Sequence, residues 1–154
     1  NRFAKKLIAG LNGTVNQKKI TLLGWAFKKD TNDSRESAAI HVADVLLEEG
    51  AELHVFDPMV KEARIYQDLT NLWEARNYSK KEIESKLKYC FVHKEHNVAL
   101  EHSFAAAILT EWDEFKSYDW DAIAHKMIKP AKVYDGRNIL KLNKNINEYY
   151  IGKS

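Results

Sequence analysis

The sequence is poor in the residues that punctuate or cross-link a chain, with one cysteine, two prolines and six glycines among 154 residues. A single thiol excludes an internal disulfide framework and fits a reducing, cytoplasmic compartment. The apolar runs are far shorter than a bilayer requires, and the first residues lack the charged and apolar regions of a signal peptide. We therefore expect neither a membrane span nor a disulfide-stabilised secreted domain.

An excess of charge of one sign is also absent. Lysine and arginine number 24 against 22 acidic residues, a net charge of +2. This balance argues against a broad basic surface for nucleic acid or an anionic membrane, so any anion binding has to be local. With 45% hydrophobic residues, the chain suffices for one core and hence one domain. It begins with asparagine instead of methionine, which suggests a piece of a longer protein.

Helical and strand-like patterns alternate along the first third of the chain. The opening segment places apolar residues on one helical face and then offers Gly13 as a cap: Phe3, Leu7, Ile8 and Leu11. A short buried strand is predicted at residues 20–23, a helix from Ser37 to Gly50, and a strand ending at Asp57 and Pro58. Asp33 and Ser34 are candidate N-caps of that helix, with Glu36 as a capping-box partner. Strand, helix and strand in this spacing indicate a parallel βαβ unit.

The remainder predicts more strands of the same kind. Ser79 is expected to cap a helix that ends at Leu87, and a second helix is expected over residues 119–127, before Pro130. Strands are predicted at residues 89–92, 105–110, 131–135 and 149–151. No element is predicted between residues 59 and 78. The pattern favours an α/β fold, Rossmann-like and doubly wound, with a mostly parallel sheet of about five or six strands.

Ligands of such sheets bind beyond the carboxyl ends of the strands. The first loop there reads GWAFKKDTNDSRES, from Gly24 to Ser37. It lacks the additional glycines of a dinucleotide-binding fingerprint, but it offers Lys28, Lys29 and Arg35 beside aromatic side chains, a combination that suits phosphate groups and a nucleobase. The alternative is a solvated, capped loop in which neighbouring acidic side chains neutralise these cations.

This loop is similar to the one that opens the C-terminal domain of the nucleotide-sugar dehydrogenases, and its KKDT-x-D-x-RES form is closest to the eukaryotic-type UDP-glucose dehydrogenase branch. Further matches follow in the same order: HVFDP at 54–58, TEWDEF at 110–115, KMIKPA at 126–131, YDGRNIL at 134–140 and IGK at 151–153. The resemblance covers nearly the whole chain from Lys18 and is weakest at residues 71–85. The sequence departs from it at Trp25, where a smaller aromatic is common, and at Asn138, which replaces a second arginine.

The resemblance implies a function. The family oxidises the primary alcohol of a UDP-sugar twice, with two NAD molecules in turn, through a thiohemiacetal and a thioester on a cysteine. It implies that this cysteine and the NAD-binding domain precede Asn1, so that the chain itself has no catalytic residue. Residues 1–15 would be the end of the interdomain and dimerisation helix, and residues 16–154 the UDP-sugar-binding domain of a homo-oligomer.

The resemblance also implies roles for single residues. Phe27 and Lys28 would contact the UDP-sugar, Arg137 would hold it from a second loop, and Arg35 would reach the NAD bound by the preceding domain.

Other candidates have simpler interpretations. Cys90 lies in the strand-like KYCFV with no base spaced to activate it, which favours a core or interface role. His93, His96 and His102 lack partners at metal-ligand spacing. Asp57 resembles a ribose-binding acid, but next to Pro58 it is better explained as a turn residue.

Two other functions stay open at this stage. The chain could be chiefly an oligomerisation module that acts through its first helix, or it could bind another nucleotide sugar, such as a UDP-N-acetyl-hexosamine or GDP-mannose.

Overall fold

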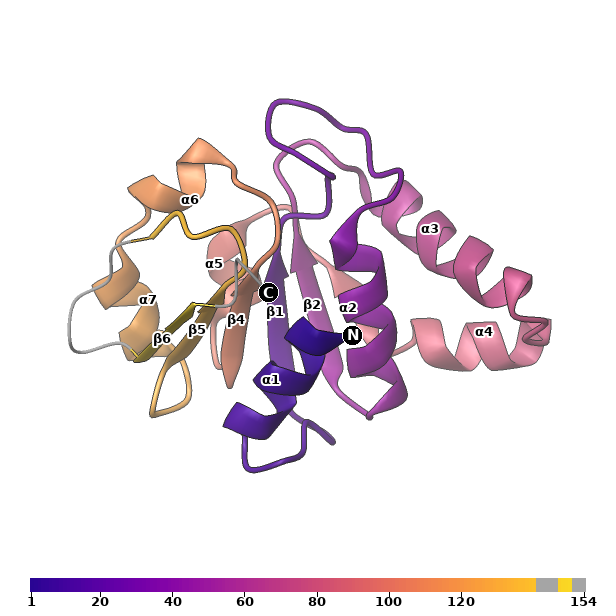
Figure 1. Cartoon of the computed structure of the whole chain (residues 1–154), viewed down its shortest axis with the longest axis horizontal. Helices are drawn as coiled ribbons and strands as arrows, with labels where there is room; N and C mark the ends of the chain where they lie inside the picture. Colours follow the sequence, from indigo (N-terminus) through magenta and orange to yellow (C-terminus); the bar gives the residue numbers. More distant parts are fainter. Residues whose placement is uncertain (141–146, 151–154) are drawn as a thin grey trace.

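A parallel sheet flanked by helices forms the centre of the computed structural model, which describes residues 1–140 and, as backbone, 147–150 (Figure 1). The described strands form a six-stranded sheet in the order β3-β2-β1-β4-β5-β6, and each neighbouring pair is parallel. The strands are β1 (Lys19–Leu23), β2 (Glu52–Phe56), β3 (Cys90–Val92), β4 (Ala105–Ile108), β5 (Lys132–Asp135) and β6 (Asn147–Tyr150). The predicted α/β class and doubly wound parallel sheet are confirmed.

Helices cover both faces of this sheet. They are α1 (Arg2–Gly10), α2 (Ala38–Glu48), α3 (Glu62–Ala75), α4 (Lys80–Leu87), α5 (His96–Leu100), α6 (Asp113–Ser117) and α7 (Trp120–Lys126). In Figure 1, α1 and α2 lie in front of the central strands and α5 lies behind them. None of the helices in the described part of the chain has the length and apolarity needed to span a bilayer.

The strand order explains where a site can form. From β1 the chain winds through β2 to β3 at one edge, and it then crosses back to β4 on the other side of β1. The loops that leave β1 and β4 consequently diverge toward opposite faces of the sheet, which opens a crevice at their carboxyl ends. Leu23, Phe56 and Ile108 are in register there, so the loops after three central strands begin side by side.

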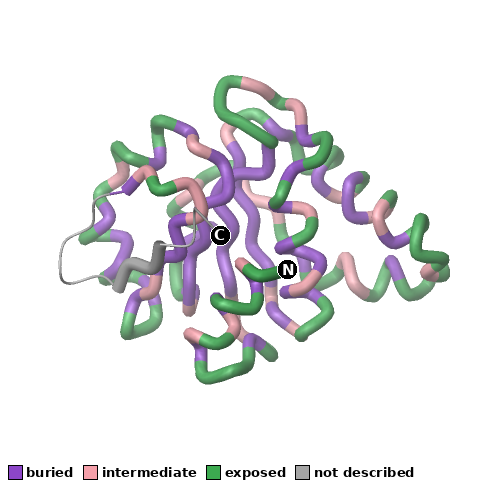
Figure 2. The backbone as a smooth tube through the Cα atoms, viewed as in Figure 1, coloured by how far each residue is buried: buried purple, intermediate pink, exposed green. Residues whose placement is uncertain are grey.

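The core lies on both sides of the central strands, whose backbone is buried in Figure 2, whereas the loop above β1 is mostly exposed. Leu7 and Leu11 are buried in this core, and Phe3 and Ile8 pack against it. The predicted apolar face of the first helix therefore covers the core of this same domain. Gly13, with a φ of +80°, closes the turn after the helix and donates its N–H to the carbonyl of Ile8 at 3.1 Å.

The N-cap of α2 differs from the prediction. Ser37 is the N-cap, and its side chain accepts the N–H of Ala39 at 3.2 Å. Asp33 and Ser34 lie in the loop before it, because their side chains bind other partners, and Glu36 takes a left-handed φ of 59° that interrupts any helix from Asp33. The predicted capping box at Asp33 and Glu36 is wrong.

The middle of the chain holds two helices that the sequence did not predict, α3 and α5. The predicted helix after Ser79 is confirmed, with a complete capping box between Ser79 and Glu82. The strands observed in the structure begin or end one or two residues away from the predicted bounds. The predicted strand at 149–151 overlaps β6, and Ile151 lies outside the described residues.

Candidate functional site at the carboxyl ends of β1, β2 and β4

The crevice begins where the loops after β1 and β4 touch. Gly24 has a φ of +98°, and a Cβ at this position would lie 2.5 Å from the side chain of Thr110. Only glycine accommodates both this backbone conformation and this close approach. Thr110 also fixes the next turn of the loop, since its hydroxyl donates to the carbonyl of Ala26 at 2.6 Å.

The buried carboxylate of Asp57 joins three loops at this point. It follows β2, and Oδ1 accepts the backbone N–H groups of Met59 and Val60 at 2.8 and 2.9 Å, which is the local turn that the sequence predicts. Oδ2 accepts three further donors, namely the N–H of Trp25 at 2.6 Å, the N–H of Ala26 at 2.9 Å and the indole N–H of Trp112 at 3.2 Å. Both oxygens are thus engaged by the protein, which argues against the ribose-binding interpretation.

Arg137 brings the turn after β5 to the same place. Its Nη2 donates to the carbonyl oxygen of Phe27 at 3.0 Å, and its Nε donates to that of Leu109 at 2.9 Å. The turn itself is held by Asp135, a fully buried side chain whose carboxylate accepts the N–H groups of Arg137, Ile139 and Leu140. Among the residues that the structure describes, Nη1 has only a long contact of 3.8 Å with Glu111, so it keeps donors for a ligand.

Phe27 adjoins Arg137 through its backbone carbonyl, and Lys28 is the next residue of the loop; we call these three residues, Phe27, Lys28 and Arg137, the mouth of the crevice. Phe27 is 37% exposed, and the Lys28 ammonium is 5.3 Å from the centre of its ring. An aromatic ring beside a cation and a guanidinium that keeps free donors form a surface suited to an anion attached to an apolar group.

A cavity of about 790 Å³ opens beside Arg137. It is lined by the start of α1, by α2 and α6, and by the loops after β1, β4 and β5. Its cations are Lys29, which the sequence singles out, and Arg2 and Lys116, which it does not. Lys29 and Lys116 both approach Asp113, at 3.4 and 3.5 Å, and the charge of Lys29 lowers the pKa of that carboxyl. These cations come from three separate elements, so their proximity has no signature in the local sequence.

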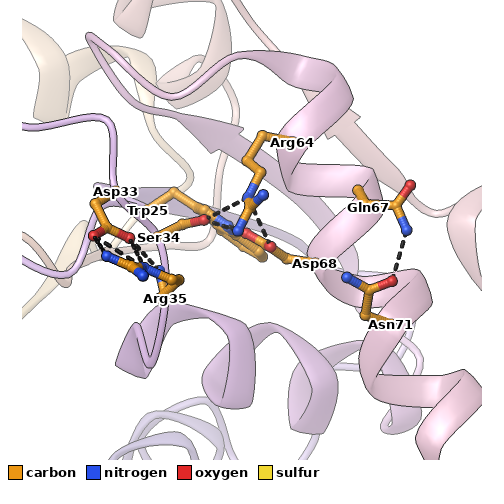
Figure 3. A network of polar contacts seen from close by, with 8 residues as sticks. All are labelled: Trp25, Asp33, Ser34, Arg35, Arg64, Gln67, Asp68 and Asn71. Atoms are coloured by element: carbon orange, nitrogen blue, oxygen red, sulfur yellow. Dashed lines mark hydrogen bonds and ion pairs between the residues drawn. The ribbon is translucent and has the colours of Figure 1, made fainter.

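Arg35 lies apart from this mouth, on a second cavity of about 560 Å³ that is also lined by Lys61 and Arg64. Its guanidinium, 79% exposed, forms an ion pair of 2.7 Å with Asp33 and lowers the pKa of Asp33 to about 2 (Figure 3). Of the four predicted site residues, Arg137 lines the first cavity and Arg35 lines the second. Phe27 and Lys28 line neither of these two cavities, and Phe27 adjoins Arg137 through its backbone carbonyl.

The start and the end of the first loop are both anchored to α3, through Trp25 and Ser34 (Figure 3). Asp68, buried on α3, accepts the indole N–H of Trp25 at 2.9 Å and the hydroxyl of Ser34 at 2.6 Å, and it pairs with Arg64 at 3.1 Å. The large indole that distinguishes this loop is therefore fully buried and hydrogen-bonded. Asn138, the second departure, takes a left-handed φ of 55°, a conformation that asparagine tolerates better than most residues.

Cys90 and the predicted histidines lie elsewhere. Cys90 is buried, and burial raises the pKa of its thiol to about 12, which confirms its core role. His93 is 2.6 Å from His54, His96 stacks on Tyr118, and His102 is paired at 3.6 Å with Glu101. Within residues 1–140 no group of three or more metal-ligating side chains is close enough to hold an ion.

A doubly wound parallel sheet with cationic loops at its switch point defines a nucleotide-binding α/β domain. Residues 21–142 match the model of the UDP-glucose/GDP-mannose dehydrogenase family, UDP binding domain. The chain belongs to this family.

Curated relatives agree with this assignment. The chain is 42% identical to UDP-glucose 6-dehydrogenase of Bos taurus over 139 residues, which cover 90% of the chain and 27% of the relative. It is 43% identical to the UDP-glucose 6-dehydrogenase of Drosophila melanogaster over 141 residues, or 90% of the chain and 28% of the relative. The chain thus spans a little over a quarter of the length of these relatives.

Solved structures share the fold. A UDP-glucose dehydrogenase from Pyrobaculum islandicum superposes with a TM-score of 0.64 at 26% identity, over 98% of this chain and 28% of that one. A UDP-D-ManNAc dehydrogenase from Pyrococcus horikoshii reaches a TM-score of 0.71 at 24% identity, over 99% of this chain and 30% of that one.

Proposed function

We propose that the chain is the UDP-sugar-holding part of an NAD-dependent UDP-glucose 6-dehydrogenase, an enzyme that converts UDP-glucose, two NAD⁺ and water to UDP-glucuronate and two NADH. The observation that carries this proposal is the hydrogen bond of 3.0 Å from Arg137 to the carbonyl of Phe27. It joins the two cationic turns at the switch point of a sheet whose family is that of the UDP-binding domains.

Each residue of the mouth has a role in this proposal. Lys28 and the free Nη1 of Arg137 hold the diphosphate, a group that attracts a point charge and a planar guanidinium alike. Phe27 offers an exposed ring to the apolar faces of the uridine or the sugar. Arg35 faces a different cavity, in keeping with a role toward NAD, and its exposed pair with Asp33 is weak enough to open for that ligand.

The chemistry of the reaction requires residues outside this chain. A thiol nucleophile has to be ionised and accessible, whereas Cys90 is buried with a raised pKa. We therefore propose that the cysteine and the main NAD site belong to a part of the enzyme that precedes residues 1–15, and that the whole enzyme is a cytoplasmic homo-oligomer. An assembly role for residues 1–15 alone has less support, since Leu7 and Leu11 are buried within this chain.

Calorimetric titration of the 154-residue chain tests the proposal. We expect weak binding of UDP and UDP-glucose, because only part of the cleft is present, weaker binding of GDP-mannose and of UDP-N-acetyl-hexosamines, and no NADH production. Lys28→Glu and Arg137→Glu should each lower the affinity for UDP. The matched control is Lys88→Glu, since Lys88 is also exposed but lies just before β3, at the amino end of an edge strand, whereas the mouth lies beyond the carboxyl ends of the strands.

Two results would contradict the proposal. One is a chain that is folded and binds no uridine nucleotide. The other is a loss of affinity in Lys88→Glu as large as that in Lys28→Glu, because the effect of charge would then be general and not tied to the mouth.

A further inference from the structure

The carboxylate of Asp57 engages more donors than its own turn requires. The turn after β2 uses only Oδ1, which accepts the N–H groups of Met59 and Val60. Oδ2 serves residues that are 31, 32 and 55 positions away in the sequence. Because a turn needs no such distant partners, Asp57 has a second function, which is to hold the loops after β1 and β4 against each other.

An ionised carboxylate is the side chain suited to this arrangement. Five N–H donors converge on its two oxygens, and a carboxylate accepts at both while carrying no donor of its own. The amide of asparagine would turn an NH₂ group toward one set of these donors, whichever way it is oriented. With only 7% of Asp57 exposed, water has little room to replace the lost acceptor.

The donors on Oδ2 fix the backbone that leads directly to the mouth. The N–H of Ala26 donates to Asp57, and the carbonyl of the same residue accepts from Thr110 at 2.6 Å. The carbonyl of Phe27 then accepts from Arg137 at 3.0 Å. Asp57, Thr110 and Arg137, which follow three different strands, therefore hold the segment of residues 25–27. Lys28 is the next residue of the chain.

We infer that Asp57 is a positioning residue for the UDP-sugar: it sets Phe27 and Lys28 at the distance from Arg137 that the diphosphate requires. The inference rests on the proposed function, since it assigns a means of building that same site. It gives the buried acid of the HVFDP motif a role that no local turn explains. Binding sites built on side chains lose affinity steeply when the supporting contacts relax, because the geometry of the ligating groups is lost.

The test compares UDP binding by the 154-residue chain and by Asp57→Asn, followed by NMR titration of backbone amides at a temperature where both are folded. We expect the UDP affinity of Asp57→Asn to be roughly tenfold lower than that of the original chain. Without UDP, the differences in amide chemical shift between the two chains should be concentrated in residues 25–28. The matched control is Asp44→Asn. Asp44 is a buried acid that accepts from the Trp73 indole at 2.8 Å and pairs with Arg76 at 2.7 Å, and it holds α2 against the end of α3. Asp44→Asn should lower stability and leave UDP affinity unchanged.

A double substitution separates positioning from general loosening. If Asp57 acts through Lys28, then Asp57→Asn should have little further effect on UDP affinity in a chain that already carries Lys28→Ala. Additive losses would overturn the inference. Should Asp57→Asn fail to fold, Asp57→Glu keeps the charge and displaces the oxygens by one methylene, and an unchanged UDP affinity in this variant would overturn the inference as well.

Failure of the proposed function and failure of the inference about Asp57 give different results. If the unsubstituted chain does not bind UDP, the proposed function is overturned and the inference with it. If the chain and a folded Asp57→Asn bind UDP equally well, the inference alone is overturned.

Discussion

The guanidinium of Arg137 donates to the carbonyl oxygen of Phe27 at 3.0 Å, across 110 residues of sequence. This bond joins the turn after β5 to the loop after β1. Arg137, which we propose binds the ligand, therefore has a structural role as well. A second donor of its guanidinium, Nε, donates to the carbonyl of Leu109. Stability and nucleotide binding are therefore coupled at this residue.

Arg137→Lys should separate the two roles. A lysine has no planar fork to reach both carbonyl oxygens, so we expect the free energy of unfolding to fall by about 1–2 kcal/mol in urea denaturation. The control is Arg35→Lys, because Arg35 is 79% exposed and its ion pair with Asp33 lies at the surface. That variant should stay within about 0.5 kcal/mol of the original chain. Equal losses in both variants would contradict the bridging role of Arg137.

Alanine substitutions of Gly24 and Gly13 can be compared to measure how much the close approach of Gly24 to Thr110 matters for stability. Both have positive φ values, of +98° and +80°, but a Cβ on Gly24 would meet Thr110 at 2.5 Å, whereas nothing lies within 4 Å of one on Gly13. We expect Gly13→Ala to cost about 1 kcal/mol, from the backbone conformation alone, and Gly24→Ala to cost about 2–4 kcal/mol. Thermal denaturation of the two variants measures the difference. Equal melting temperatures would show that the contact with Thr110 is unimportant.

Two histidines on neighbouring strands predict a pH dependence of stability. His54 Nε2 faces Glu52 at 2.8 Å, and a carboxylate only accepts; hence His54 Nδ1 is free to accept from His93 Nε2 at 2.6 Å. Burial lowers the pKa of both imidazoles below the ordinary 6.5, and the charge of Lys19 acts in the same direction. The folded chain then binds fewer protons than the unfolded chain. The stability due to this pair is present above pH 6.5 and is lost as the pH falls through the lowered values.

Urea midpoints measured between about pH 7.5 and 5.5 test this dependence. We expect the midpoint to fall with the pH and the slope to be reduced in His93→Gln. His41→Gln is the control, because His41 is exposed on α2 and is not part of this histidine pair. A slope that is unchanged in His93→Gln would refute the assignment.

The buried thiol of Cys90 predicts slow labelling. Since burial raises its pKa to about 12, an aromatic disulfide reagent at about pH 8 should react with the native chain on the order of a hundred times more slowly than with the urea-unfolded chain. Rapid labelling of the native chain would contradict a core position.

The sequence predicted the sheet well because its strands are short apolar runs, and β1, β2 and β5 end at a glycine or an aspartate. It did not predict α3, whose buried residues Ile65, Leu69 and Trp73 recur with helical spacing but are separated by polar and charged residues. Its N-cap, Lys61, makes no side-chain hydrogen bond, so the usual start signal was missing. The N-cap of α2 was misplaced for the opposite reason, since Asp33 and Ser34 looked like caps but bind Arg35 and Asp68 instead.

The candidate site was predictable only in part. Motifs named Phe27, Lys28 and Arg137, and parallel topology implied that their loops meet. The joining contacts lie between residues far apart in the sequence, such as Asp57 with Trp112 and Arg137 with Phe27, and no local pattern encodes them. Sequence reasoning could therefore identify Asp57 as a turn residue but could not detect that it holds two other loops.

The central claim is that Lys28 and Arg137 bind one diphosphate together, and titration of the ¹⁵N-labelled chain with UDP, followed by ¹H–¹⁵N correlation spectra, tests it most directly. The account predicts that amides of residues 24–29 and of residues 136–138 shift along the same binding curve, with a single dissociation constant, and that uridine without phosphate shifts neither group to the same extent. Shifts confined to one of the two segments, or two different dissociation constants, would contradict it.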